Sequence, residues 1–204
     1  MRNSFVGITE WITRFAYLNV LWIAFTLLGG IILGLFPATI AMFAITRQWV
    51  RKETDQPIFS SFWKTYKREF FRSNLLGVCF YVIGFIFYIN VLLLSVIDSG
   101  IYDSVKIPVY FSMCVIGLIM LYVLPVYVHY DLRLLTIWKN AFFIMISHPL
   151  HNMIMVIASA LSIYLLLQLP ATLFFFSGSM VTYIIMVISY HAFTRIAIKK
   201  GEFA

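Results

Sequence analysis

The residues best suited to chemistry in this sequence are four histidines, and two of them are close together. His148 and His151 lie three positions apart in the segment SHPLHN. A helix would place them on one face, although Pro149 stands between them and disfavours a regular helix. A zinc site needs three or four ligands, and no Cys, Asp or Glu neighbours the pair. The spacing therefore predicts histidines at a membrane–water interface, and we expect neither a metal nor a cofactor.

One further acid–base group is visible, the segment HYDLR, which places His129 near Asp131 and Arg133. Nothing beside it supplies a nucleophile, and a hydrolytic site needs a nucleophile next to a base. The sequence also lacks the G-x-S-x-G, P-loop and G-x-G-x-x-G motifs. We therefore expect a protein that is not an enzyme and has no catalytic residue.

Composition explains why chemistry is scarce. Hydrophobic residues make up 62% of the 204 positions and charged residues only 11%, with a mean hydropathy of +0.94. Soluble domains carry about 45–50% apolar and about 25% charged residues, so this chain is typical of an integral membrane protein. Its net charge of +7 could suit nucleic acid or an anionic membrane. The basic residues lie between long apolar runs, which favours membrane lipids and not nucleic acid as partners.

Four apolar runs are long enough to cross a bilayer, which takes about 20 residues. None of the four contains a charged residue, and the last two are separated only by Pro170, which predicts a tight hairpin. The predicted spans are Leu75–Ile97, Ile107–Val128, Leu150–Leu169 and Ala171–Tyr190. Lipid cannot hydrogen-bond an exposed backbone, so these runs predict helices.

The first apolar stretch, Phe15 to Ile45, is too long for one straight span. One possibility is a turn near Gly29-Gly30, which makes two short spans. The alternative is one kinked span that ends near Pro37. We favour the turn, and the chain as a whole, residues 1–204, is predicted to be a single all-α bundle of five or six spans.

Loop charges predict how the spans are threaded. Between Thr46 and Asn74 the chain has seven Lys or Arg residues against three carboxylates, which marks a cytoplasmic segment. The loops then alternate without conflict, and they place the tail with Arg195, Lys199 and Lys200 inside. Six spans also place Arg2 and Arg14 inside, whereas five would place them outside, so the rule favours six. We expect a multi-pass protein of the bacterial cell membrane with a cytoplasmic C-terminus.

Residues 57–73 are predicted to form a basic amphipathic helix in the cytoplasmic interface. At about 100° per residue, Phe59, Phe62, Trp63, Tyr66 and Phe70 share one face of this helix. Such a face suits the acyl boundary while cations reach the headgroups. The helix is either a structural lead into the next span or a contact for lipid or a partner. The candidate contact residues are Phe62, Trp63, Lys64, Tyr66, Lys67, Arg68 and Arg72.

Two amides are the polar residues at depth in the predicted spans, Asn19 and Asn90. Amides inside membranes usually join helices by hydrogen bonds, although they can also bind a ligand. No Asp, Glu, Lys or Arg lies in the middle of a predicted span, which disfavours a pump that relies on a buried carboxylate.

Several segments together identify a resemblance to a known family. LNVLW, GLFPAT, RQWVRKETDQPIF and FWKTYKREFFRSNLLG, in the range 18–77, resemble the YesL-like bacterial membrane proteins, and the later spans match in hydropathy and length. The genes of this family often stand beside ABC importers and hydrolases for plant-wall oligosaccharides. The resemblance thus implies an accessory or regulatory subunit for sugar uptake with ABC transporter subunits as partners. A self-contained transporter or channel and a membrane sensor are the alternatives.

Overall fold

The computed structural model describes the backbone of residues 4–96 and 100–199, and it is helical nearly throughout. Arg2 and Lys200, which entered the predicted threading, lie outside the described residues. The helices are α1 (Ser4–Leu28), α2 (Ile32–Val50), α3 (Ile58–Val96), α4 (Gly100–His129), α5 (Leu134–Ser147), α6 (Pro149–Leu167) and α7 (Pro170–Lys199).

Six of these helices are long and apolar enough to cross a membrane, which confirms the predicted all-α, multi-span class. The four long apolar runs fall in α3, α4, α6 and α7, and the expected tight hairpin joins α6 to α7. Helix α5 was not predicted, because its 14 residues are too few to span a bilayer and follow a charged segment that reads as a loop.

A turn at residues 29–31 divides the first apolar stretch into α1 and α2, as the preferred prediction had it. Gly30 has φ +74°, and the N–H groups of Gly30 and Ile31 bond to the carbonyls of Leu27 and Thr26. These two bonds form a Schellman motif, in which glycine adopts the left-handed conformation that other residues resist. The alternative, one kinked span ending near Pro37, is wrong.

Pro37 lies inside α2 and is buried. Proline is tolerated within membrane helices because neighbouring groups satisfy the carbonyl that it leaves free. Within the first apolar stretch, the reversal of the chain is therefore made by the turn at residues 29–31 and not by Pro37.

Helix α2 is the centre of the bundle. Its small residues Ala38 and Ala41 are fully buried, and α2 contributes to both apolar clusters of the core. One cluster joins α2 to α1 and the start of α3 around Leu18 and Phe25. The other joins it to α4, α5, α6 and α7. Small residues let helices approach closely, which is how membrane helices gain packing energy.

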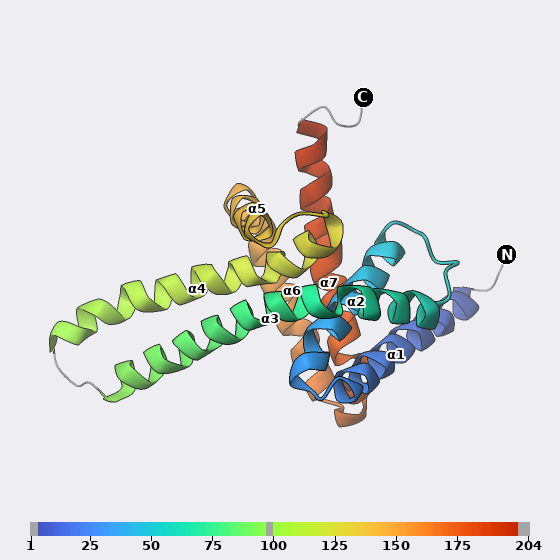
Figure 1. Cartoon of the computed structure of the whole chain (residues 1–204), viewed down its shortest axis with the longest axis horizontal. Coiled ribbons are helices and arrows are strands. Elements are labelled where there is room, and N and C mark those ends of the chain that lie inside the picture. The colour runs from blue at the N-terminus through green and yellow to red at the C-terminus, as the bar shows by residue number, and fades with distance from the viewer. Residues whose placement is uncertain (1–3, 97–99, 200–204) are drawn as a thin grey trace.

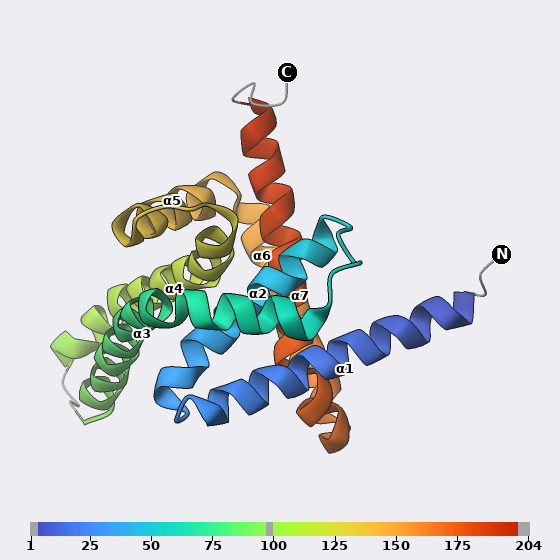
Figure 2. The same ribbon diagram turned by 45° about the vertical axis from the view of Figure 1, so that its right-hand side comes forward.

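The helices are not all parallel. Helices α3 and α4 form an antiparallel pair that projects from the body, whereas α6 and α7 cross behind α2 (Figures 1 and 2). Many apolar side chains on the projecting arms are exposed, among them Phe85 and Phe111. Exposed apolar surface of this extent is typical of a membrane-facing exterior.

The charged ends of several helices gather at one end of the bundle. Arg14 of α1 donates to the carbonyl of Thr54 at 3.1 Å, so this part of α1 lies near the α2–α3 connection. The ring of His129 at the end of α4 lies 5.7 Å from that of Tyr190 in the last part of α7. The end of α2 and the end of α4 also line one cleft, so these segments lie at the same end of the bundle.

Candidate functional site: a cation-rich cleft

A cleft opens between α2, the first turns of α3 and the end of α4, with a volume of about 1000 Å³. Helix α2 lines it with a stripe of residues spaced three or four apart, which places them on one face. The first part of α3 provides a facing stripe with the same spacing. The α2 stripe is Ile40, Ala44, Arg47, Gln48 and Arg51, and the α3 stripe includes Ser61, Lys64, Thr65, Arg68 and Arg72.

Charge in the cleft is unbalanced. Five cations and three carboxylates line it, and each carboxylate pairs with one arginine. The pairs are Arg51–Glu53 at 3.0 Å, Arg68–Glu69 at 2.8 Å and Arg72–Asp131 at 3.0 Å.

Two cations are left over, Arg47 from α2 and Lys64 from α3. Neither has a carboxylate partner in the part of the chain that the structure describes. The Nε atom of Arg47 is buried and has no hydrogen-bond partner among the residues that the structure describes. A guanidinium donor in that position gains from an acceptor brought by a ligand.

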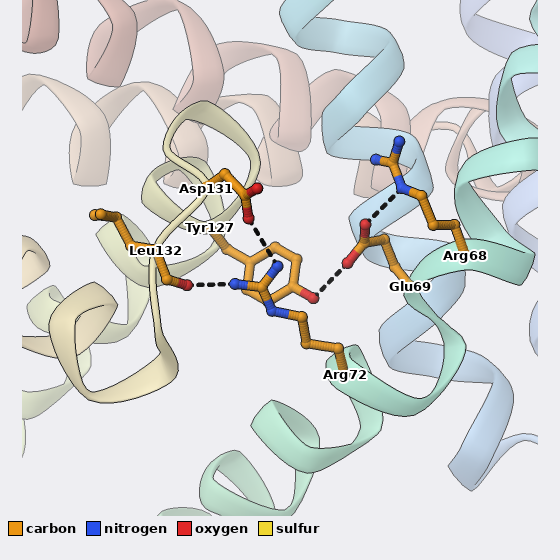
Figure 3. Close-up of polar contacts among 6 residues, drawn as sticks. All are labelled: Arg68, Glu69, Arg72, Tyr127, Asp131 and Leu132. Carbon is orange, nitrogen blue, oxygen red and sulfur yellow. Dashed lines mark hydrogen bonds and ion pairs between the residues drawn. The ribbon is translucent and has the colours of Figure 1, made fainter.

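Arg72 fastens one wall of the cleft (Figure 3). Its guanidinium donates to Asp131 and to the carbonyl of Leu132, and it lies 5.2 Å from the centre of the Tyr127 ring. Because the Asp131 side chain is 96% exposed, that ion pair is screened and contributes little. The carbonyl bond and the ring contact therefore give the link its geometry.

A second link joins α4 to the same turn of α3. The hydroxyl of Tyr127 donates to one oxygen of Glu69 at 2.8 Å, and the other oxygen accepts from Arg68 Nε at 2.8 Å. Glu69 is 12% exposed, so this carboxylate is better shielded from water than Asp131. Figure 3 shows the two links side by side, and together they tie α3 to α4 and to the segment that follows it.

The predicted interfacial helix forms, but it does not end at residue 73. It is the first part of α3, a single helix of 39 residues. Of the predicted contact residues, Lys64, Arg68 and Arg72 line the cleft. Sequence periodicity predicts which residues share a face of this helix, but it does not predict what packs against each face.

The aromatic face is the main correction. Phe62 and Tyr66 were expected to contact lipid or a partner, but they are 0% and 6% exposed. Both pack with Phe25 of α1, and the Tyr66 hydroxyl donates to the Phe25 carbonyl at 3.2 Å. The α1–α2 hairpin covers this face, because an apolar surface can be buried by protein as well as by lipid.

Trp63 and Lys67 lie on the outer side of α3. The Lys67 ammonium sits 4.6 Å from the centre of the Trp63 ring, and both side chains are exposed. Their contact with lipid or a partner stays a prediction.

The two amides have different surroundings. Asn19 is fully buried between α1 and α7, where its Nδ2 donates to the Phe174 carbonyl at 2.6 Å. Its Oδ1 accepts from the N–H groups of Gly178 and Ser179 at 2.9 and 3.0 Å. Asn90 donates only to Ile86, one turn earlier in its own helix. Asn19 thus joins two helices, whereas the expected contact between helices is absent at Asn90 among the described residues.

The histidines do not converge as a metal site in the described part of the chain. The rings of His148 and His151 lie 5.1 Å apart, and with Arg195 of α7 they line a smaller cavity of about 450 Å³. His129 lines the cleft instead.

Sequence reasoning missed Arg47, Arg51 and the end of α4 as parts of one site. The signal was present in part, since Arg47, Gln48 and Arg51 continue the face of α2 beyond its apolar run. The facing stripe of α3 and the return of α4 to the same place depend on tertiary packing.

Comparison with known proteins links the chain to three relatives of Bacillus subtilis (strain 168). It is 34% identical to the uncharacterized protein YesL, with 94% of this chain and 90% of the relative covered. It is 36% identical to the uncharacterized protein YteU, over 95% and 86% of the two chains, and 32% identical to YesV, over 91% and 89%. Residues 15–91 match the family described as "Protein of unknown function, DUF624". No solved structure matches.

Proposed function

Because the chain belongs to the YesL-like family, we propose that it is an accessory or regulatory membrane subunit of an ABC-type oligosaccharide importer. Its partners are then membrane lipids and the importer's own membrane subunits, and it has no enzymatic activity. The link to sugar uptake comes from the gene neighbourhoods that the family resemblance implies.

The accessory role is supported by the positions of the polar side chains in the bundle. Several polar side chains buried among the helices are occupied by bonds between helices. Asn19 joins α1 to α7, and Asn152 accepts from Tyr122 of α4 at 2.8 Å and donates to Met145 of α5 at 2.8 Å. Charge is instead concentrated in the cleft at one end. This distribution favours a protein that responds to or contacts something at its polar end over one that conducts a solute.

The proposed orientation places the cleft and both termini in the cytoplasm of a bacterial cell. It rests on the excess of Lys and Arg at this end of the bundle. Reporter fusions ahead of Arg2 and after Ala204 test it, and both should report cytoplasm. A reporter at either end that is active only outside the cell would refute the orientation.

The function is tested by uptake of labelled plant-wall oligosaccharides in a deletion strain and in liposomes that contain only the purified protein. We expect reduced uptake in the deletion strain, its restoration by the wild-type gene, and no uptake by the liposomes. Uptake by the liposomes would favour a self-contained transporter. Normal uptake and growth of the deletion strain on every such glycan would refute the link to sugars and leave a membrane sensor as the alternative.

A further inference from the structure

We propose that the cation-rich cleft is a binding site for a phosphate monoester, which is held between Arg47 and Lys64. The inference rests on the geometry of the cleft and not on the proposed link to an importer. It concerns the two cations that no carboxylate neutralises in the described part of the chain, one on each facing helix.

The charge of the cleft matches that of a phosphate monoester. Three carboxylates are paired with three arginines, which leaves Arg47 and Lys64 as the excess. A phosphate monoester carries about −1.5 to −2 charges at neutral pH, so one such group balances both. An arginine can offer two parallel N–H donors to its oxygens, and a lysine adds a compact positive charge.

Neutral donors line the same cleft as the two cations. They are Ser61 and Thr65 of α3 and Gln48 of α2. Hydroxyl and amide groups complete the hydrogen bonding of phosphate oxygens that the cations do not reach. They also suit the hydroxyl groups of an organic portion of the ligand. The volume of about 1000 Å³ admits a ligand larger than phosphate alone.

A compact dianion fits this cleft better than an acidic peptide. Glu53, Glu69 and Asp131 also line the walls, and they would repel an extended chain of carboxylates. A single phosphate bound at Arg47 and Lys64 places its negative charge next to the two unpaired cations. Binding of an acidic peptide is therefore the alternative that the experiment must exclude.

The experiment measures binding to the full chain in nanodiscs of neutral phosphatidylcholine. The soluble arm titrates inorganic phosphate and glycerol 3-phosphate by calorimetry. The lipid arm incorporates phosphatidic acid, a phosphate monoester lipid, and compares it with phosphatidylglycerol, a diester, at equal charge density. Saturable binding in the soluble arm identifies a soluble ligand, and a preference for phosphatidic acid alone identifies a lipid headgroup. Both results support the proposal.

The variants Arg47→Gln and Lys64→Gln should each weaken binding at least tenfold. Lys67→Gln is the matched control, because Lys67 is one turn from Lys64 on the same helix but lies over Trp63 outside the cleft lining. Its affinity should stay within twofold of wild type. Lys64 is exposed, so the test does not depend on how well an Arg47 variant folds.

Three results would overturn the proposal. Binding in neither arm would remove it, and an equal loss in Lys67→Gln and Lys64→Gln would show only general attraction to a basic surface. An octaglutamate peptide that binds through Lys64 while both phosphate arms fail would assign the cleft to an acidic partner segment instead.

Discussion

Replacing Asn19 with leucine should weaken the contact between α1 and α7 by an amount that the structure allows to be worked out. The side chain makes three hydrogen bonds to the α7 backbone, through the Phe174 carbonyl and the N–H groups of Gly178 and Ser179. Hydrogen bonds between membrane helices contribute about 0.6 kcal/mol each on average, so losing all three should cost about 2 kcal/mol.

Leucine at this position also changes the packing. It is larger than asparagine, so it leaves no cavity but crowds a buried site, which adds about 1–3 kcal/mol to the cost of the lost bonds. Asn19 is 0% exposed, so leucine gains no new contact with lipid. The backbone groups of α7 can still bond to one another within the helix, so the variant leaves no buried group without a partner.

The matched control is Asn90→Leu. Among the described residues Asn90 donates to Ile86 in its own helix and to no other helix, so this variant should change the free energy of unfolding by less than about 0.5 kcal/mol. The assay is reversible unfolding in mixed micelles, with increasing sodium dodecyl sulfate and helix content as the signal. Equal effects of the two variants, or a loss below about 0.5 kcal/mol for Asn19→Leu, would refute the account of this contact.

Three further tests, two of them with a matched control variant, concern the fold. Gly34→Ala should prevent stable folding, since its Cβ would lie 2.3 Å from a backbone oxygen of α1. The control Gly84→Ala meets no atom within 4 Å and should be neutral or stabilising by up to about 1 kcal/mol. The yield of monodisperse protein checks both variants. Phe62→Ala should cost about 3–5 kcal/mol in the same unfolding assay, and Phe71→Ala, at a side chain 87% exposed, under about 1 kcal/mol. Tyr127→Phe removes a hydroxyl that joins α4 to α3 and should cost about 1 kcal/mol while the helix content stays unchanged; no loss would show that this link is dispensable.

Hydropathy and turn residues are enough to predict the class of the protein and most of its helices. Continuous apolar runs can be satisfied in lipid only as helices, so their positions follow directly from hydropathy. Gly29-Gly30 marked the first turn, because a left-handed residue after a helix favours glycine. The periodicity of residues 59–73 also placed Phe62 and Tyr66 on one face and Lys64 and Arg68 on another, as the structure has them.

Only the tertiary structure decided what those faces touch. Periodicity cannot distinguish a face covered by lipid from one covered by protein, and the α1–α2 hairpin covers Phe62 and Tyr66. Nor can it distinguish Asn19, which meets another helix, from Asn90, which does not. The cleft depends on bringing Arg47 and Lys64 to facing walls from separate helices. That placement follows from how α2, α3 and α4 pack together, and short-range sequence patterns do not contain it.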